Sequence, residues 1–106
     1  MSIKEADEIL LNTSNQFIGL FTHGTLSVEY YKPLAVDNQE PHDRDEIYVV
    51  ARGCGDFLND GKIKKFAQGD FLLVKAGVEH RFLNFSDDFS TWVFFYGPKG
   101  GESETT

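Results

Sequence analysis

Most of the chain alternates between apolar and polar residues with a period of two, which is typical of β-strands that bury one face. In residues 25–31, for example, Leu26, Val28 and Tyr30 alternate with polar side chains. Similar runs recur about every 8–12 residues, a spacing typical of a β-sandwich or barrel. The clearest strand-like runs cover residues 17–21, 25–31, 46–52, 56–58, 62–66, 71–74, 80–85 and 91–96.

The N-terminus follows a different pattern, because residues 2–11 place apolar side chains such as Ala6 and Leu10 at helical spacing. Ser2 and Glu5 fit a capping box, in which each side chain accepts a hydrogen bond from the other residue's backbone. The sequence therefore predicts a short helix ahead of an otherwise all-β fold.

The length of 106 residues is that of one domain with its own hydrophobic core. We expect an N-terminal helical segment over residues 1–15 and a β-barrel over residues 16–98. Residues 99–106 are polar and rich in glycine, and they predict a disordered tail.

The charge excludes some partners. With 17 acidic and 10 basic residues, the net charge is −7, so the chain repels phosphate backbones and anionic membranes. No apolar run approaches the roughly 20 residues of a membrane span. The single cysteine, Cys54, forms no internal disulfide and is expected to be a small packing residue. We expect a cytoplasmic protein that binds neither nucleic acid nor membrane.

Two histidines and a glutamate interrupt these apolar runs. His42, Glu46 and His80 are costly to bury without partners, and a metal ion rewards all three. Glu40 has the same parity as His42 and Glu46, so in a continuous strand the three would share a face, whereas a tight loop after His42 is the alternative. The ligand types suit one divalent transition metal, Zn, Fe, Ni or Mn. His23 precedes a turn glycine, and we do not count it as a ligand.

The spacing of these residues resembles the first conserved motif of the cupin superfamily, G-x5-H-x-H-x3–4-E-x6-G. The chain has His42-x3-Glu46-x6-Gly53, with Glu40 in the place of the first histidine. The match depends on residue types and intervals together, not on any single residue.

A second stretch resembles the second cupin motif, G-x5-P-x-G-x2-H-x3-N. The chain has Gly69-x5-Lys75-x-Gly77-x2-His80-x3-Asn84, with lysine replacing proline. The resemblance covers roughly residues 20–97 and suggests a small single-domain cupin.

This resemblance implies a double-stranded β-helix, or jelly-roll barrel. One metal would be held by His42, Glu46 and His80, and the family's fourth ligand falls at Glu40. Glu40 either ligates directly or lies outside a three-ligand site. The resemblance also implies a homodimer, because small cupins commonly form dimers.

A pocket wall is the remaining candidate feature. Four aromatic residues at even positions are expected to face the barrel interior, as core or as walls of a ligand pocket: Tyr48, Phe82, Trp92 and Phe94. Arg81, beside a candidate ligand, could meet a substrate carboxylate.

Three functions stay open from the sequence. The chain is a metal-dependent enzyme acting on a small polar molecule, of the dioxygenase, isomerase or decarboxylase type that the family resemblance implies. Alternatively it is a non-catalytic module that binds a metal or a small metabolite. A metal-free barrel is the third reading. The sequence names no substrate, because one fold supports many activities.

Overall fold

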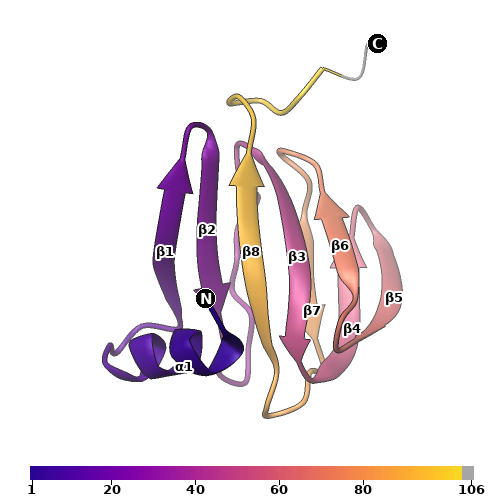
Figure 1. Ribbon diagram of the computed structural model, residues 1–106. Coiled ribbons are helices and arrows are strands. Elements are labelled where there is room, and N and C mark those ends of the chain that lie inside the picture. Colours follow the sequence, from indigo (N-terminus) through magenta and orange to yellow (C-terminus); the bar gives the residue numbers. More distant parts are fainter. Residues whose placement is uncertain (104–106) are drawn as a thin grey trace.

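The computed structural model describes residues 1–103, which form one helix and eight strands in two facing sheets (Figure 1). The helix α1 spans Ile3–Leu11. The strands are β1 Phe17–His23, β2 Leu26–Tyr31, β3 Asp45–Arg52, β4 Cys54–Asn59, β5 Lys62–Ala67, β6 Phe71–Val74, β7 His80–Leu83 and β8 Ser90–Tyr96.

The strand order is that of a jelly roll. One sheet has the order β1-β2-β8-β3-β6 and the other β5-β4-β7. All of the strand pairs are antiparallel, and β8 inserts between β2 and β3 although it is last in the chain. This order confirms the predicted all-β jelly roll with one short helix.

The space between the two sheets is filled largely by aromatic rings. Phe82 lies at its centre, with its ring centroid 4.9 Å from Tyr48, 4.7 Å from Phe57 and 4.6 Å from Phe89. Each of these rings is buried. Offset and edge-on contacts at such distances stabilise a core beyond simple area burial.

Helix α1 lies across the outer face of the five-stranded sheet (Figure 1). Its capping box is formed as predicted, since the Ser2 hydroxyl accepts from the Glu5 backbone and Glu5 accepts from the Ser2 backbone. Ala6 and Leu10 are buried against Tyr30. The predicted helical face is therefore the one that packs on the sheet.

Two of the motif positions have backbone reasons for their residue types. Gly53 has a φ of 92°, and a Cβ atom there would lie 2.7 Å from the Cα atom of Phe89, so only glycine fits between β3 and β4. Asn84 has a φ of 51°, in the left-handed region that asparagine tolerates better than most residues. The motif thus specifies turns as well as site residues.

The segment after β8 makes contacts that the predicted tail did not include. The Gly100 N–H donates to the Asp43 carbonyl at 2.6 Å, and the Glu102 N–H donates to the Asp45 carboxylate at 2.8 Å. Asp45 also accepts from the Ala76 N–H. The disorder expected of residues 99–106 therefore does not describe residues 100–102, and residues 104–106 lie outside the described part.

Asp7 is predicted to hold α1 on the sheet. It accepts from the Tyr30 hydroxyl at 2.6 Å and pairs with Arg52. Burial alone would raise the pKa of Asp7, but the hydrogen bonds from Tyr30 and Arg52 and the charge of Arg52 together lower it. Because the folded pKa lies below the unfolded value, Asp7 contributes stability above about pH 4 that is lost as pH falls through the folded pKa.

We expect Asp7→Asn to lower the free energy of unfolding by about 1 kcal/mol at pH 7, with the difference shrinking below about pH 4. Urea unfolding followed by tryptophan fluorescence at several pH values measures this. Asp87→Asn, at an exposed acid, removes the same charge and is the control. Equal losses in both variants would show that net charge, not the Asp7 contacts, sets the effect.

Candidate metal centre

Three side chains that could hold a metal ion meet between the two sheets. Glu46 comes from β3, His80 from the start of β7, and His42 from the loop before β3. One potential ligand atom from each lies within 4.8 Å of the others. His80 Nε2 is 2.8 Å from Glu46 Oε1, and His42 Nε2 is 3.9 Å from the same oxygen.

The turn before β7 connects the two histidine segments. The Gly77 N–H donates to the His42 carbonyl at 2.7 Å. The Val78 carbonyl lies 2.9 Å from His80 Nδ1, and because a carbonyl only accepts, Nδ1 carries the proton. Nε2 of neutral His80 therefore presents its lone pair to the centre, the arrangement usual for a metal-ligating histidine.

Several polar atoms of this centre are buried without a hydrogen-bond partner. They are both carboxylate oxygens of Glu46 and Nε2 of His80. Glu46 Oε1 and His80 Nε2 thus lie 2.8 Å apart without hydrogen-bond geometry. A cation between these atoms would satisfy all three, so the donor set fits a divalent transition metal.

The centre also favours positive charge on His80 itself. Burial, the largest single effect, lowers the pKa of His80, but the contact with Glu46 and the Val78 carbonyl outweigh it and raise the pKa above its usual value. A proton and a metal ion therefore compete for the same position, and metal affinity should rise with pH.

The centre opens to solvent through His42. The side chains of Glu46 and His80 are almost fully buried, whereas that of His42 is 33% exposed. Beside it lies a cavity of about 300 Å³, large enough for a small organic molecule. The lining residues are Phe17, Glu29, Tyr31, Gln39, His42, Val93 and Phe95.

Glu29 is the carboxylate of this cavity. Within residues 1–103 it makes no hydrogen bond or ion pair. Burial, and then the charge of Glu46, raise the pKa of Glu29 above its usual value. An acid kept without a partner beside a candidate metal centre is a candidate ligand-binding or proton-transfer group.

A second carboxylate, that of Asp37, accepts several hydrogen bonds from within the protein. It accepts from the Tyr31 hydroxyl at 2.7 Å, the Phe82 N–H at 2.8 Å and the Gln39 side-chain amide at 3.0 Å. Gln39 in turn accepts from the Tyr48 hydroxyl at 3.0 Å. Burial holds the pKa of Tyr48 well above its usual value, so this hydroxyl keeps its proton and donates.

The remaining residues predicted for the site lie elsewhere. Glu40 is exposed and lies outside the group of three among the described residues. Its ligand role stays a prediction without support from the geometry, because the segment before β3 is a loop and the parity of a strand does not apply to it. Arg81 follows His80 in β7 and points to the opposite face of that strand.

Of the four aromatic residues predicted to face the barrel interior, two do so and two do not. Tyr48 and Phe82 face the interior but belong to the packed core. Trp92 and Phe94 instead lie on the outer face, where they line a shallow pocket with Met1, Val28 and Val49. Val93 and Phe95 take the inner positions of β8.

Strand register explains this correction. In the antiparallel pair of β3 and β8, Tyr48 lies opposite Val93 and Glu46 lies opposite Phe95. Residues directly opposite each other share a face, so odd positions of β8 match even positions of β3. The sequence shows which residues of one strand share a face. It does not show how two strands are aligned with each other, because that register depends on the lengths of the loops between them.

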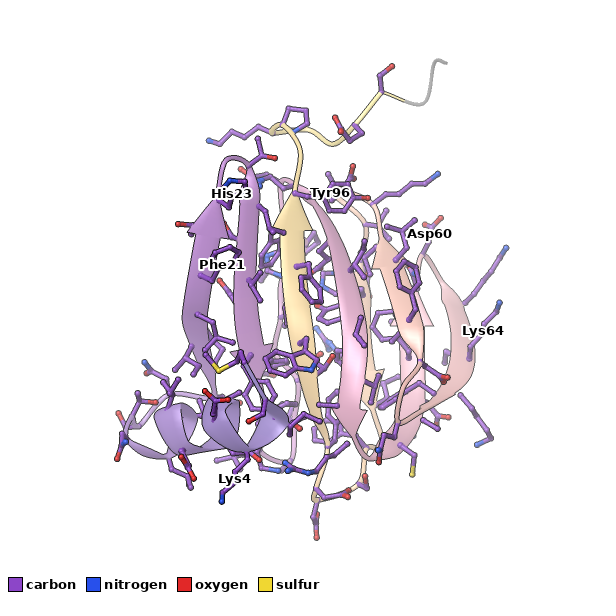
Figure 2. All side chains as sticks on the ribbon, viewed as in Figure 1. Lys4, Phe21, His23, Asp60, Lys64 and Tyr96 are labelled. Carbon is purple, nitrogen blue, oxygen red and sulfur yellow. The ribbon has the colours of Figure 1, made fainter. Side chains whose placement is uncertain are left out.

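His23 and Cys54 take no part in the centre. His23 is exposed at the end of β1, where its ring stacks on Phe21 (Figure 2). Cys54 is a free, exposed thiol at the start of β4, not the buried residue expected from the sequence.

Three residues near the centre could not be identified from the sequence: Glu29, Asp37 and Gln39. Glu29 was visible only as a polar residue in an alternating strand, and its face could not be assigned to the interior. Asp37 and Gln39 lie in a loop without periodicity. No sequence signal identified them, because their role depends on tertiary contacts.

The structure is an antiparallel jelly roll with a His-Glu-His cluster between its sheets that could hold a metal ion. Residues 27–96 match the model of the cupin domain, and the chain belongs to this family. The prediction made from the two motifs is thereby confirmed.

The chain is similar to an uncharacterized protein of Streptomyces coelicolor, SCO3923, with 35% identity over 63 residues, covering 59% of this chain and 60% of that relative. The match thus spans less than two thirds of the relative's length.

Two solved structures share the fold at low sequence identity. A cupin 2 conserved barrel domain protein from Salinispora arenicola has a TM-score of 0.65 at 18% identity, covering 76% of this chain and 74% of that one. KdgF from a Halomonas species has a TM-score of 0.65 at 17% identity, covering 77% and 78%. Within residues 1–103, no helix is long and apolar enough to cross a membrane.

We expect Glu29→Gln to stabilise the metal-free protein at pH 7. Because the folded pKa of Glu29 is raised, the folded state loses stability as pH rises from about 4.5 through that pKa, and the amide removes this loss. The gain should be at most about 1 kcal/mol, since water screens a partly exposed carboxylate.

Urea unfolding in the presence of a chelator, at pH 4 and pH 7, measures the effect. The two proteins should differ at pH 7 and converge at pH 4. Glu8→Gln, at an exposed glutamate of α1, is the matched control. A destabilised Glu29→Gln variant at pH 7 would mean that Glu29 has a structural partner.

Proposed function

We propose that the protein is a metal-dependent enzyme that acts on a small polar molecule bound in the cavity beside His42. The observation that carries this proposal is the group of buried, unpartnered atoms on Glu46 and His80, which adjoins a cavity large enough for a ligand. His42, Glu46 and His80 would hold one divalent transition metal, Zn, Fe, Ni or Mn. A bound ion of this kind supplies Lewis acidity or activates water or dioxygen.

The cavity itself offers both apolar and polar contacts. Phe17, Val93 and Phe95 present apolar surface, and the ring of Phe95 meets His42 edge-on at a centroid distance of 5.0 Å. Glu29 would accept a hydrogen bond from a hydroxyl or amino group of the ligand, or hold a proton at its carboxylate. Molecules with a polar donor on a small apolar body therefore suit this cavity.

A non-catalytic module that binds a metal or small metabolite is the alternative. The unpartnered carboxylate of Glu29 favours turnover, because an acid with a raised pKa is suited to proton transfer. Turnover also requires coordination positions that the protein leaves open, which a storage site does not need.

We expect untagged protein to contain about one transition metal ion per chain, measured by inductively coupled plasma mass spectrometry. His80→Ala should lose the metal, since it removes a buried ligand. His23→Ala should retain the metal, because His23 is exposed and is the last residue of β1, outside the candidate centre (Figure 2).

Reconstitution gives a second readout. Metal at 100 times its dissociation constant should raise the free energy of unfolding by about 2.7 kcal/mol in the wild type and not in His80→Ala. Wild-type protein that binds none of the four metals after dialysis against them would refute the proposed centre.

We also propose that the chain forms a homodimer through the outer face of its five-stranded sheet. Helix α1 covers only part of this face. Large apolar side chains on the uncovered part are exposed, among them Phe21, Phe71 and Leu73. Phe21 lies on β1 and the other two on β6, so exposed apolar side chains are found at both edges of this sheet, and such surface can mark a protein interface.

Phe21→Glu should shift the protein from dimer to monomer in sedimentation equilibrium, because a charge would be buried at the interface. Ile63→Glu is the control, since Ile63 is 61% exposed on the other sheet, compared with 56% for Phe21. A wild-type monomer at all concentrations, or a dimer unaffected by Phe21→Glu, would contradict this interface.

A further inference from the structure

The side-chain amide of Gln39 has a defined orientation. Gln39 Nε2 lies 3.0 Å from Asp37 Oδ2, and because a carboxylate only accepts, the nitrogen must be on this side. Gln39 Oε1 therefore faces the other way, where it lies 3.0 Å from the Tyr48 hydroxyl and 3.3 Å from His42 Nε2. The hydrogen bond from Gln39 Nε2 to Asp37 therefore directs the amide oxygen towards His42, a residue of the candidate metal centre.

Asp37 fixes this arrangement from behind. It is buried, and the Tyr31 hydroxyl and the Phe82 N–H hold its carboxylate in addition to Gln39. It also accepts from the backbone N–H of Gln39 at 3.2 Å. Both the main chain and the side chain of Gln39 thus donate to one buried carboxylate.

The distance from Gln39 to His42 suits two ligands of one ion. Ligand atoms about 2.1 Å from a metal are separated by about 3.0 Å at a right angle and about 3.4 Å at a tetrahedral angle. The 3.3 Å between Gln39 Oε1 and His42 Nε2 falls in this range. An amide oxygen is also a chemically suitable ligand for a divalent ion.

Glu40, the next residue, does not compete for this position. Its side chain is exposed, and within residues 1–103 it has no hydrogen bond or ion pair. Adjacent residues in the same loop thus differ sharply: one side chain is tied to the centre and the other extends into solvent.

We propose that Gln39 Oε1 is the fourth protein ligand of the metal centre and that Asp37 is the residue that positions it. This inference rests on the proposed metal site. It assigns the fourth position to a neutral amide, so the protein would contribute one carboxylate, one amide and two imidazoles, and the bound dication would keep a net charge of +1.

The test is the affinity of untagged protein for Ni²⁺, measured by isothermal titration calorimetry after removal of metal with a chelator. We expect Gln39→Ala to weaken binding about 10- to 100-fold. Glu40→Ala, one residue away, should bind within about twofold of the wild type. Asp37→Asn should weaken binding by retaining Gln39 but releasing its orientation.

Two further measurements separate ligation from loss of folding. Gln39→Asn keeps the amide but shortens the side chain by one methylene, and it should also bind weakly while melting near the wild-type temperature. The visible absorption spectrum of Co²⁺-loaded protein reports its ligand set, and it should change in Gln39→Asn and stay unchanged in Glu40→Ala.

The outcomes are distinct. Wild-type protein that binds no Ni²⁺ would refute the metal site itself. Tight binding by both Gln39 variants, with the wild-type cobalt spectrum, would overturn only the role of Gln39. Weak binding by Glu40→Ala with normal binding by Gln39→Asn would assign the fourth position to Glu40 instead.

Discussion

The contact between Glu46 and His80 is the constraint on which the centre depends. Both side chains are almost fully buried, and they approach to 2.8 Å without forming a hydrogen bond. Removing a carboxylate from water costs several kcal/mol unless it is compensated by a cation or by donors. A protein that keeps this pair in its interior therefore needs a proton or a metal ion there. The fixed tautomer of His80, set by the Val78 carbonyl, leaves Nε2 free to serve either one.

The jelly roll makes this contact possible by bringing distant segments together. Glu46 projects inward from β3 of one sheet and His80 from β7 of the other, while the Gly77 N–H ties the turn before β7 to the carbonyl of His42. Below the centre, packed rings such as Phe82 fill the space between the sheets. Access is thereby confined to the side of His42, where the cavity lies. The same packing that stabilises the barrel determines from which direction a ligand can approach.

The sequence predicted the parts of this structure that depend on local chemistry. The capping box, the alternating strands and the intervals around His42, Glu46 and His80 are all local patterns, and the structure brings those three side chains together. The sequence could not predict which face of the sheet Trp92 and Phe94 lie on, because the register between β3 and β8 determines this. The contacts of loop residues could not be predicted either, since a loop has no periodicity that would show which side chains lie on the same side.

Two acidic residues near the centre differ in whether their carboxylates have hydrogen-bond partners within the fold. Asp37 uses its carboxylate entirely for contacts within the fold, where it accepts from Tyr31, Gln39 and Phe82. Glu29 makes no such bond in residues 1–103, and burial and the charge of Glu46 both disfavour its ionised form. A carboxylate of the first kind adds rigidity, whereas one of the second kind lowers stability near neutral pH. Because an unpartnered acid adds no stability to the fold, the place of Glu29 in the cavity supports the ligand-binding or proton-transfer role proposed for it.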